Sequence, residues 1–342
     1  MVQGVPDYSV DPHLSPAVKA FLTPLNAPGP AMESLSEQDS RNLLIDLQAS
    51  VKVDLSGIDE SEKTITQDGY TVKLTFVRPT GNNKKLPLFI FAHGGGWVLG
   101  DYPTHKRLVR DLVVASQCAA VFVHYTLSPE AHYPQAINEI YAAAKWVSEH
   151  GDEINVDGKN IAAVGNSAGG NLTTALCMMA KDKGGPGIKL QILMWPATDS
   201  SFTEDSYEKY GDQRFLTTPL MKWSWDRYTT DTTQRKEKYA SPLQASLEEL
   251  KDLPPALIQV AENDILRDEG EAYGRKLEQA GVKVISVRYN GMIHDFGMLN
   301  GLAETAQVKG LIELAAAELK KHLTFETVAT ASAVNSPEIL RK

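Results

Sequence analysis

The sequence predicts an α/β protein in which a mostly parallel central sheet forms the middle of a three-layer sandwich. Short, unbroken apolar runs recur along the chain, separated by segments long enough for a helix. Such runs are typical of strands covered on both faces, as in a parallel sheet flanked by helices. The 342 residues, 42% hydrophobic and 23% charged, have ordinary globular composition and suffice for one large core or two smaller ones.

Residues 1–50 precede the first strand pattern, and we expect them to form helices. Ser15 followed by Pro16 is typical of a helix start. Ser36 and Asp39 resemble a capping box ahead of a second apolar stripe. We interpret these helices as one part of a cap over the sheet.

The sheet is expected to begin with an antiparallel hairpin, because Thr71–Arg78 alternates and Asp68 with Gly69 supplies a turn before it. The parallel strands are expected to follow as separate apolar runs. These runs are 86–92, 119–124, 161–164, 190–195, 256–261 and 282–289. Helical segments between them complete the alternation.

One connection is too long for a simple crossover, since about sixty residues separate Trp195 from Ala256. Seven aromatic residues are concentrated in positions 202–228 of this segment, although aromatics make up 8% of the chain. We interpret residues 199–245 as the second part of the cap. Its rings are expected to line a substrate pocket, although an aromatic core local to the insertion is the alternative. The predicted pocket residues are Phe215 and Trp223 of this segment, together with Trp97 from an earlier part of the chain.

These assignments divide the chain into five parts. The N-terminal cap helices occupy 1–50, and the main domain is expected to consist of 51–198 and 246–323, interrupted by the insertion at 199–245. Residues 324–342 have no clear period and are interpreted as a C-terminal tail.

A candidate nucleophile lies in Gly165–Gly169, which reads GxSxG directly after one predicted strand and directly before a predicted helix. A strand that turns sharply into a helix exposes the serine oxygen at the helix N-terminus, where backbone N–H groups favour negative charge. Small residues on both sides allow the two elements to approach closely. Ser167 is therefore the predicted nucleophile.

A second motif, His93–Trp97, follows the strand predicted at 86–92 and contains three consecutive glycines. Glycines without side chains allow backbone N–H groups to point into a site, as an oxyanion hole requires. We expect the donors to be Gly95 and Gly96, joined by Ala168, with Gly94 as the less favoured donor. His93 is expected to brace the loop.

A serine nucleophile needs a base, and where this serine motif occurs the acid and the histidine follow it in that order. Only His294 and His322 lie beyond Ser167, and His322 follows two lysines on a predicted surface helix. His294 is therefore the predicted base. The acid is predicted to be Asp264, in the loop after the strand at 256–261, with Asp268 as the alternative because it reads as a helix cap.

Composition argues against several classes of protein. A net charge of −9 and a sequence pI near 5.4 disfavour nucleic acid as a partner. The chain shows no apolar run of membrane-span length and no signal peptide, so we expect a cytoplasmic protein that does not bind membranes. Cys118 and Cys177 are predicted to be buried free thiols. No motif indicates a metal or a cofactor.

Together the motifs resemble the bacterial hormone-sensitive-lipase family of esterases, also called family IV, over residues 10–323. The resemblance implies an α/β-hydrolase fold with a helical cap, hydrolysis of esters with short to medium acyl chains, and frequent homodimers. Two positions depart from the family pattern: Asn166 replaces the usual Asp, and Thr126 replaces the usual Arg. The segments that carry the resemblance are HGGGW at 93–97, YTLSPE at 125–130, GNSAGG at 165–170, ENDILRDEG at 262–270 and IHDF at 293–296.

The function predicted on this basis is that of a serine carboxylesterase acting through an acyl-enzyme intermediate. A non-catalytic protein that binds small molecules on the same scaffold is the alternative from another class. Amidases, lactonases and deacetylases use the same triad, so the sequence leaves these activities open.

Overall fold

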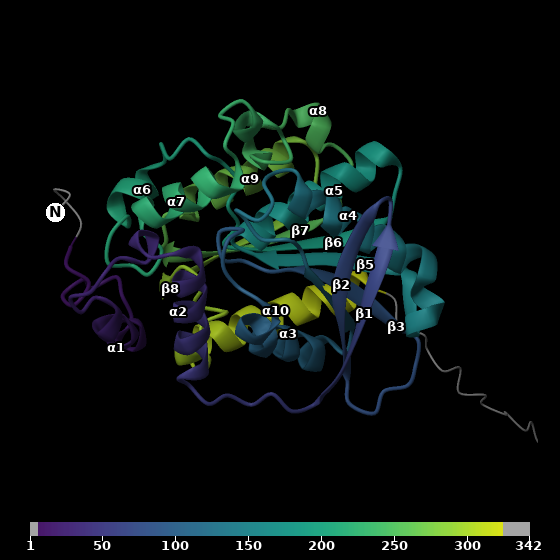
Figure 1. Ribbon diagram of the computed structural model, residues 1–342, viewed down its shortest axis with the longest axis horizontal. Coiled ribbons are helices and arrows are strands. Elements are labelled where there is room, and N and C mark those ends of the chain that lie inside the picture. The colour runs from purple at the N-terminus through teal and green to yellow at the C-terminus, as the bar shows by residue number, and fades with distance from the viewer. Residues whose placement is uncertain (1–5, 324–342) are drawn as a thin grey trace, which may run out of the picture.

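The computed structural model describes residues 6–323, and an eight-stranded sheet lies at its centre (Figure 1). The strands lie in the order β1-β2-β4-β3-β5-β6-β7-β8. The hairpin of β1 (Ile58–Gln67) and β2 (Tyr70–Pro79) is antiparallel, β2 pairs antiparallel with β4 (Ala119–His124), and the remaining neighbours are parallel. The predicted mostly parallel sheet that opens with antiparallel strands is confirmed. The predicted tail at 324–342 lies outside the described residues.

The remaining strands are β3 (Leu86–Ala92), β5 (Val156–Asn166), β6 (Ile188–Met194), β7 (Ala256–Asn263) and β8 (Val284–Ile293). The bounds of β3 and β4 equal the predicted apolar runs, since both strands are buried along almost their whole length. In contrast, β8 extends beyond its predicted end because the ladder to β7 continues as far as the pair Asn263 and Ile293. Backbone pairing, and not side-chain burial, sets that boundary.

Helices cover both faces of the sheet, which completes the predicted three-layer sandwich (Figure 1). Helices α3 (Tyr102–Ser116) and α10 (Ala306–His322) pack on one face. The other face carries α4 (Gln135–His150), α5 (Ala168–Lys183) and α9 (Arg267–Gln279). The short helices between these elements are η2 (Gly151–Ile154), η3 (Gln234–Lys236), η4 (Pro242–Gln244), α8 (Leu247–Leu250) and η5 (Asn300–Leu302).

A cap-like group of helices lies at one end of the sheet (Figure 1). It combines α1 (Pro16–Leu25), η1 (Met32–Ser34) and α2 (Glu37–Ala49) with α6 (Asp205–Lys209) and α7 (Thr218–Tyr228). The predicted N-terminal capping residues of α1 and α2 are present, because the Ser15 and Ser36 hydroxyls accept hydrogen bonds from the backbone N–H groups of Val18 and Asp39.

A buried ion pair joins the two parts of this cap. The Arg214 Nη2 atom lies 2.7 Å from Asp11 Oδ2, and the two side chains are 1% and 3% exposed. A second pair, Arg227 with Glu37 at 2.7 Å, ties α7 to α2. The N-terminal segment and the insertion therefore pack as one unit although about 200 residues separate them in the sequence. Within residues 6–323, no helix combines the length and apolar character needed to cross a bilayer.

Candidate active site

Ser167 stands at the sharp turn between β5 and α5, with φ of 52° and ψ of −122°. Few residues other than glycine adopt a positive φ, so the surrounding structure has to hold this conformation. Two hydrogen bonds do so, from Ser167 N to the Met194 carbonyl at 2.9 Å and from Ala197 N to the Ser167 carbonyl at 3.2 Å. A Cβ atom at Gly169 would collide with the carbonyl of Ala92, which explains the glycine two residues after the serine.

The structure brings Ser167, His294 and Asp264 together in one hydrogen-bonded row. His294 follows β8, and its Nε2 atom lies 2.9 Å from Ser167 Oγ. Its Nδ1 atom lies 2.8 Å from Oδ2 of Asp264, in the loop after β7. The three residues are 4%, 2% and 1% exposed, in the order serine, histidine, acid. A carboxylate that accepts a hydrogen bond from Nδ1–H leaves Nε2 unprotonated and able to take a proton from the serine hydroxyl.

The alternative acid, Asp268, lies on α9 and makes different contacts. Its Oδ1 atom accepts a hydrogen bond from Arg267 Nε at 2.7 Å, and its Oδ2 atom accepts one from the backbone N–H of Ser206 at 2.9 Å. Neither oxygen pairs with His294. Asp268 therefore ties the start of α6 to α9, whereas Asp264 is the acid beside the imidazole.

The glycine loop after β3 places Gly95 and Gly96 at the cavity that contains Ser167. Within residues 6–323, the N–H groups of these two glycines have no protein acceptor. Ala168 is the first residue of α5, where an N–H group has no carbonyl one turn earlier to bind. The Gly94 N–H instead donates to Asn166 Oδ1 at 3.0 Å, so the least favoured of the four predicted donors is already occupied.

His93 lies behind this loop, with its Nδ1 atom 2.8 Å from the Gly94 carbonyl and its ring stacked on Tyr125. Burial, assisted by the neighbouring His105, lowers the pKa of His93 to about 3. The ring is therefore neutral near pH 7 and donates to the carbonyl, which fits the predicted bracing role.

Thr126, the second position that departs from the family pattern, also makes structural hydrogen bonds. Thr126 donates from its hydroxyl and from its backbone N–H to the carboxylate of Glu139, at 2.7 and 2.6 Å. In the same motif, Glu130 forms a two-bond ion pair with Arg41 of α2, each bond 2.7 Å long. Both residues hold the segment after β4 in place, and neither lies against His294.

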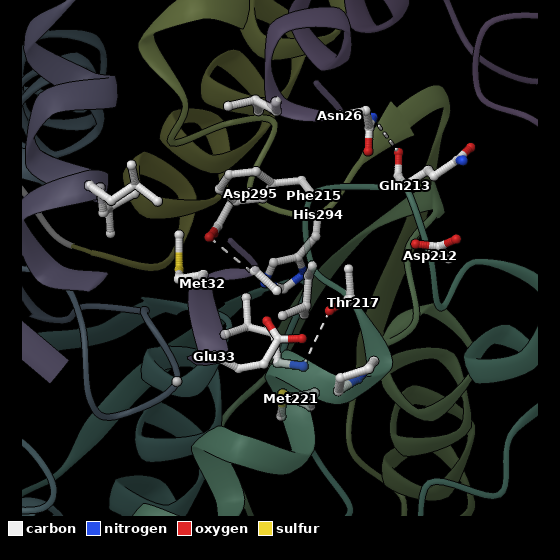
Figure 2. A pocket seen from close by; sticks show the side chains of 18 of the residues that line it. Asn26, Met32, Glu33, Asp212, Gln213, Phe215, Thr217, Met221, His294 and Asp295 are labelled. Atoms are coloured by element: carbon white, nitrogen blue, oxygen red, sulfur yellow. Dashed lines mark hydrogen bonds and ion pairs between the residues drawn. The ribbon is translucent and has the colours of Figure 1, made fainter. Parts of the chain in front are cut away.

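Sequence reasoning missed Asp295, the residue after the histidine. Its Oδ1 atom accepts hydrogen bonds from Trp195 Nε1 at 2.6 Å and from Asn166 Nδ2 at 3.0 Å, and its Oδ2 atom lies 3.8 Å from His294 Nε2. Figure 2 shows its side chain beside the imidazole. The motif IHDF already contained this carboxylate, but no pattern along the chain indicated that Trp195 and Asn166 would meet it.

The electrostatic surroundings of His294 favour its charged form. Burial lowers the pKa of the imidazole, but the Asp264 and Asp295 carboxylates raise it, and the net pKa lies above the ordinary value of 6.5. Negative charge on both sides therefore stabilises the imidazolium.

A cavity of about 1020 Å³ opens above Ser167 and His294. At its reacting end lie the glycine loop, the serine, the histidine and Asp295. Its walls come from both parts of the cap, and Figure 2 shows Met32 from the first part and Phe215 from the second around His294. Apolar wall residues include Leu22, Met32, Leu47, Phe215, Leu216 and Met221. Polar side chains also line it, among them Glu33, Asp46, Glu208 and Asp212. A concave cavity with apolar walls and polar groups beside the reacting residues is typical of small-molecule sites.

Only one of the three predicted pocket aromatics lines this cavity, namely Phe215. Trp97 is fully buried and stacks on Tyr228, with ring centroids 4.2 Å apart and planes 1° apart. Trp223 packs under the Arg227 guanidinium, 3.9 Å from the ring centroid, and is absent from the cavity wall. The prediction was wrong for these two rings: Trp97 is buried against Trp225 and Tyr228 of the insertion, and Trp223 is covered by Arg227.

Cys118 and Cys177 are buried free thiols, as predicted. In the part of the chain that the structure describes, no group of three or more His, Cys, Asp or Glu side chains is arranged to hold a metal ion.

Comparison with known proteins places this geometry among relatives. A family model described as the alpha/beta hydrolase fold matches residues 89–298. An ethyl acetate hydrolase of Pseudomonas putida is 30% identical over 320 residues, which covers 91% of this chain and 99% of the relative. A carboxylesterase of Mycobacterium tuberculosis is 33% identical over 259 residues, covering 74% and 81% of the two chains. The crystal structure of a thermostable esterase from Pseudomonas putida ECU1011 superposes with a TM-score of 0.91 at 56% identity, covering 92% of this chain and 99% of that one.

Proposed function

Because the chain belongs to the α/β-hydrolase family, in its hormone-sensitive-lipase-like branch, we propose that it is a serine carboxylesterase with Ser167 as nucleophile, His294 as base and Asp264 as the orienting acid. The observation that carries this proposal is the hydrogen-bonded row of these three side chains at the closed end of a cavity. Relatives whose names describe them as esterases support the same reaction class.

In the first half of the reaction, Ser167 Oγ attacks the carbonyl carbon of the ester while its proton moves to His294 Nε2. The carbonyl oxygen gains negative charge, and the free N–H groups of Gly95, Gly96 and Ala168 are suited to stabilise it. Nε2 then returns the proton to the alkoxide. The alcohol leaves, and the acyl group stays on the serine.

In the second half, a water molecule gives a proton to His294 Nε2 and attacks the acyl carbon. The second tetrahedral anion collapses, the proton returns to Ser167 Oγ, and the carboxylic acid is released. Asp264 accepts the hydrogen bond from Nδ1 throughout and stabilises the imidazolium. The Nε2 atom of His294 therefore acts first as a base and then as an acid in each half of the reaction.

We propose that the substrates are esters with short to medium acyl chains. The cavity has room for an ester of this size, and Phe215 with Met32 supplies apolar walls on the cap side. One relative is named for hydrolysis of ethyl acetate, a short ester. Amides, lactones and acetylated compounds present the same carbonyl chemistry, so these substrates form the comparison set.

The proposal is tested with p-nitrophenyl esters from acetate to palmitate, hydrolysed by the wild type and by Ser167→Ala. We expect turnover of the short and medium chains by the wild type and none by the variant. Anilides and lactones, measured in parallel, identify an amidase or a lactonase. If the folded wild type hydrolyses none of these compounds, the proposal is wrong, and ligand screening would test the alternative of a binding protein.

A further inference from the structure

The proposed mechanism leaves one buried carboxylate beside the imidazole without a role. Asp295 is 5% exposed and lines the cavity next to His294. Its Oδ1 atom is held by Trp195 and Asn166, whereas its Oδ2 atom has no hydrogen-bond donor within residues 6–323. The Oδ2 atom lies 3.8 Å from His294 Nε2, which is too far for a hydrogen bond. Ser167 thus keeps its hydrogen bond to Nε2, and the carboxylate acts on this atom as a charge.

Asn166 accounts for the position of this carboxylate. Its Oδ1 atom accepts the Gly94 N–H, which leaves its Nδ2 atom to donate to Asp295 Oδ1 at 3.0 Å. The same Nδ2 atom lies 3.4 Å from Nε2 of the buried His105. An aspartate in place of Asn166 would face Asp295 with a second carboxylate, and two carboxylates at hydrogen-bond distance have to share a proton. The neutral amide avoids this conflict.

The titratable and charged groups around the pair leave Asp295 and Asp264 as the charges closest to the imidazole. His105 and His93, behind the glycine loop, have pKa values lowered to about 4 and about 3 by burial, so both are neutral near pH 7. Arg107 of α3 donates to the Gly297 carbonyl and is paired with Asp111 at 2.9 Å. Burial lowers the pKa of the Arg107 guanidinium, yet Arg remains protonated in proteins.

We propose that Asp295 is a positioning residue of the esterase site: from the cavity side it stabilises the positive charge that His294 acquires during both halves of the reaction, and Asn166 is the neutral partner that holds it in place. The proposal rests on the proposed function. It assigns the imidazolium two carboxylates, Asp264 at Nδ1 and Asp295 facing Nε2. Only the first accepts a hydrogen bond from the ring.

The decisive variant is Asp295→Asn. Its side-chain oxygen still accepts hydrogen bonds from Trp195 and Asn166, so the loop keeps its anchor while the charge is lost. We expect the midpoint of the acid limb of kcat/KM for a neutral p-nitrophenyl ester to move to lower pH by at least about one unit, which is what Coulomb's law gives at this separation with the dielectric constant of water. The plateau of kcat is expected to fall about tenfold, and KM is expected to change little.

Two further variants make the result interpretable. Asp295→Ser removes the charge with a smaller side chain and has to move the acid limb in the same direction. Glu278→Gln removes one charge from an exposed position on α9 and leaves the limb where the wild type has it. Folding is checked by circular dichroism.

The outcomes separate this inference from the proposed function. If the wild type hydrolyses esters, Ser167→Ala does not, and the acid limbs of folded Asp295→Asn and Asp295→Ser coincide with the wild type, Asp295 is a structural anchor and the inference is overturned. A shift to higher pH overturns it as well. If the wild type itself lacks ester hydrolysis, the proposed function fails first, and the inference fails with it.

Discussion

Replacing Asp264 with Asn tests the geometry of the candidate site most directly, because the structure predicts the orientation of the new amide. The Oδ1 atom of Asp264 accepts a hydrogen bond from the Leu266 backbone N–H at 2.9 Å, and Oδ2 accepts one from His294 Nδ1 at 2.8 Å. In Asp264→Asn, the amide oxygen has to stay with the Leu266 N–H. The amide NH₂ group therefore faces Nδ1 of His294.

An NH₂ group is a donor, so it stabilises the tautomer in which Nδ1 is an acceptor and Nε2 carries the proton. In that tautomer Nε2 cannot take the proton of Ser167, which is 2.9 Å away. The corresponding change in a well-studied serine protease lowers kcat by about 10⁴. A loss of this size is equivalent to about 5.5 kcal/mol of transition-state stabilisation.

The assay is kcat/KM for p-nitrophenyl butyrate at pH 8, with thermal unfolding as the check of folding. Asp268→Asn is the matched control, because it makes the same chemical change only four residues further along the chain, at a carboxylate that pairs with Arg267. We expect the control to stay within about threefold of the wild type, since a paired, part-exposed charge contributes little. Activity of folded Asp264→Asn within tenfold of the wild type would refute the reasoning, as would equal losses in both variants.

Three further predictions concern pH, stability and the cavity. Hydrolysis of a neutral ester is expected to fall at low pH with a midpoint above 6.5, because His294 has to be neutral and its pKa is raised; a flat profile from pH 5 to 8 would contradict this assignment. Tyr228→Phe removes a buried hydroxyl that has no partner within residues 6–323, so we expect it to stabilise the fold by about 1 kcal/mol. In Tyr125→Phe the lost hydroxyl donates to a backbone carbonyl at 2.9 Å, so we expect destabilisation by a similar amount. Equal shifts of the two variants in thermal unfolding would contradict this prediction. Phe215 lines the cavity, so we expect Phe215→Ala to move the acyl-chain optimum to longer esters. Trp97 is buried away from the cavity, so we expect Trp97→Ala to lower the free energy of unfolding by about 3–5 kcal/mol. An unchanged chain-length profile in Phe215→Ala would argue against the place of this ring in the cavity wall.

Much of the fold was predictable because its signals are local. The runs at 86–92 and 119–124 are apolar throughout and are buried in the sheet, so their ends are visible in the sequence. The serine turn has a local signal too, the GxSxG pattern between a strand and a helix, although its final glycine is required by the distant Ala92 carbonyl. The order of serine, acid and histidine along the chain then led to the residues that the structure brings together.

The remaining features depend on contacts between distant segments. Trp97 and Phe215 look alike in the sequence, but only Trp97 meets Tyr228, 131 positions further on, and is buried by it. Asp295 gains its surroundings from Asn166 and Trp195, at the ends of two other strands. The homodimer, the cytoplasmic location and the boundaries of the five parts of the chain stay predictions.

Different segments of the chain build the two ends of the cavity, and this has a consequence for how the substrate range of such a protein changes during evolution. Its reacting end is built by the sheet, at Gly95, Gly96, Ser167 and His294, whereas most of its walls come from residues 22–50 and 207–224. A mutation in the walls reshapes the space offered to a substrate without disturbing the strained serine turn. Selection, in nature or in a mutant library, can therefore change which esters bind through substitutions in the cap, while the reacting residues stay unchanged.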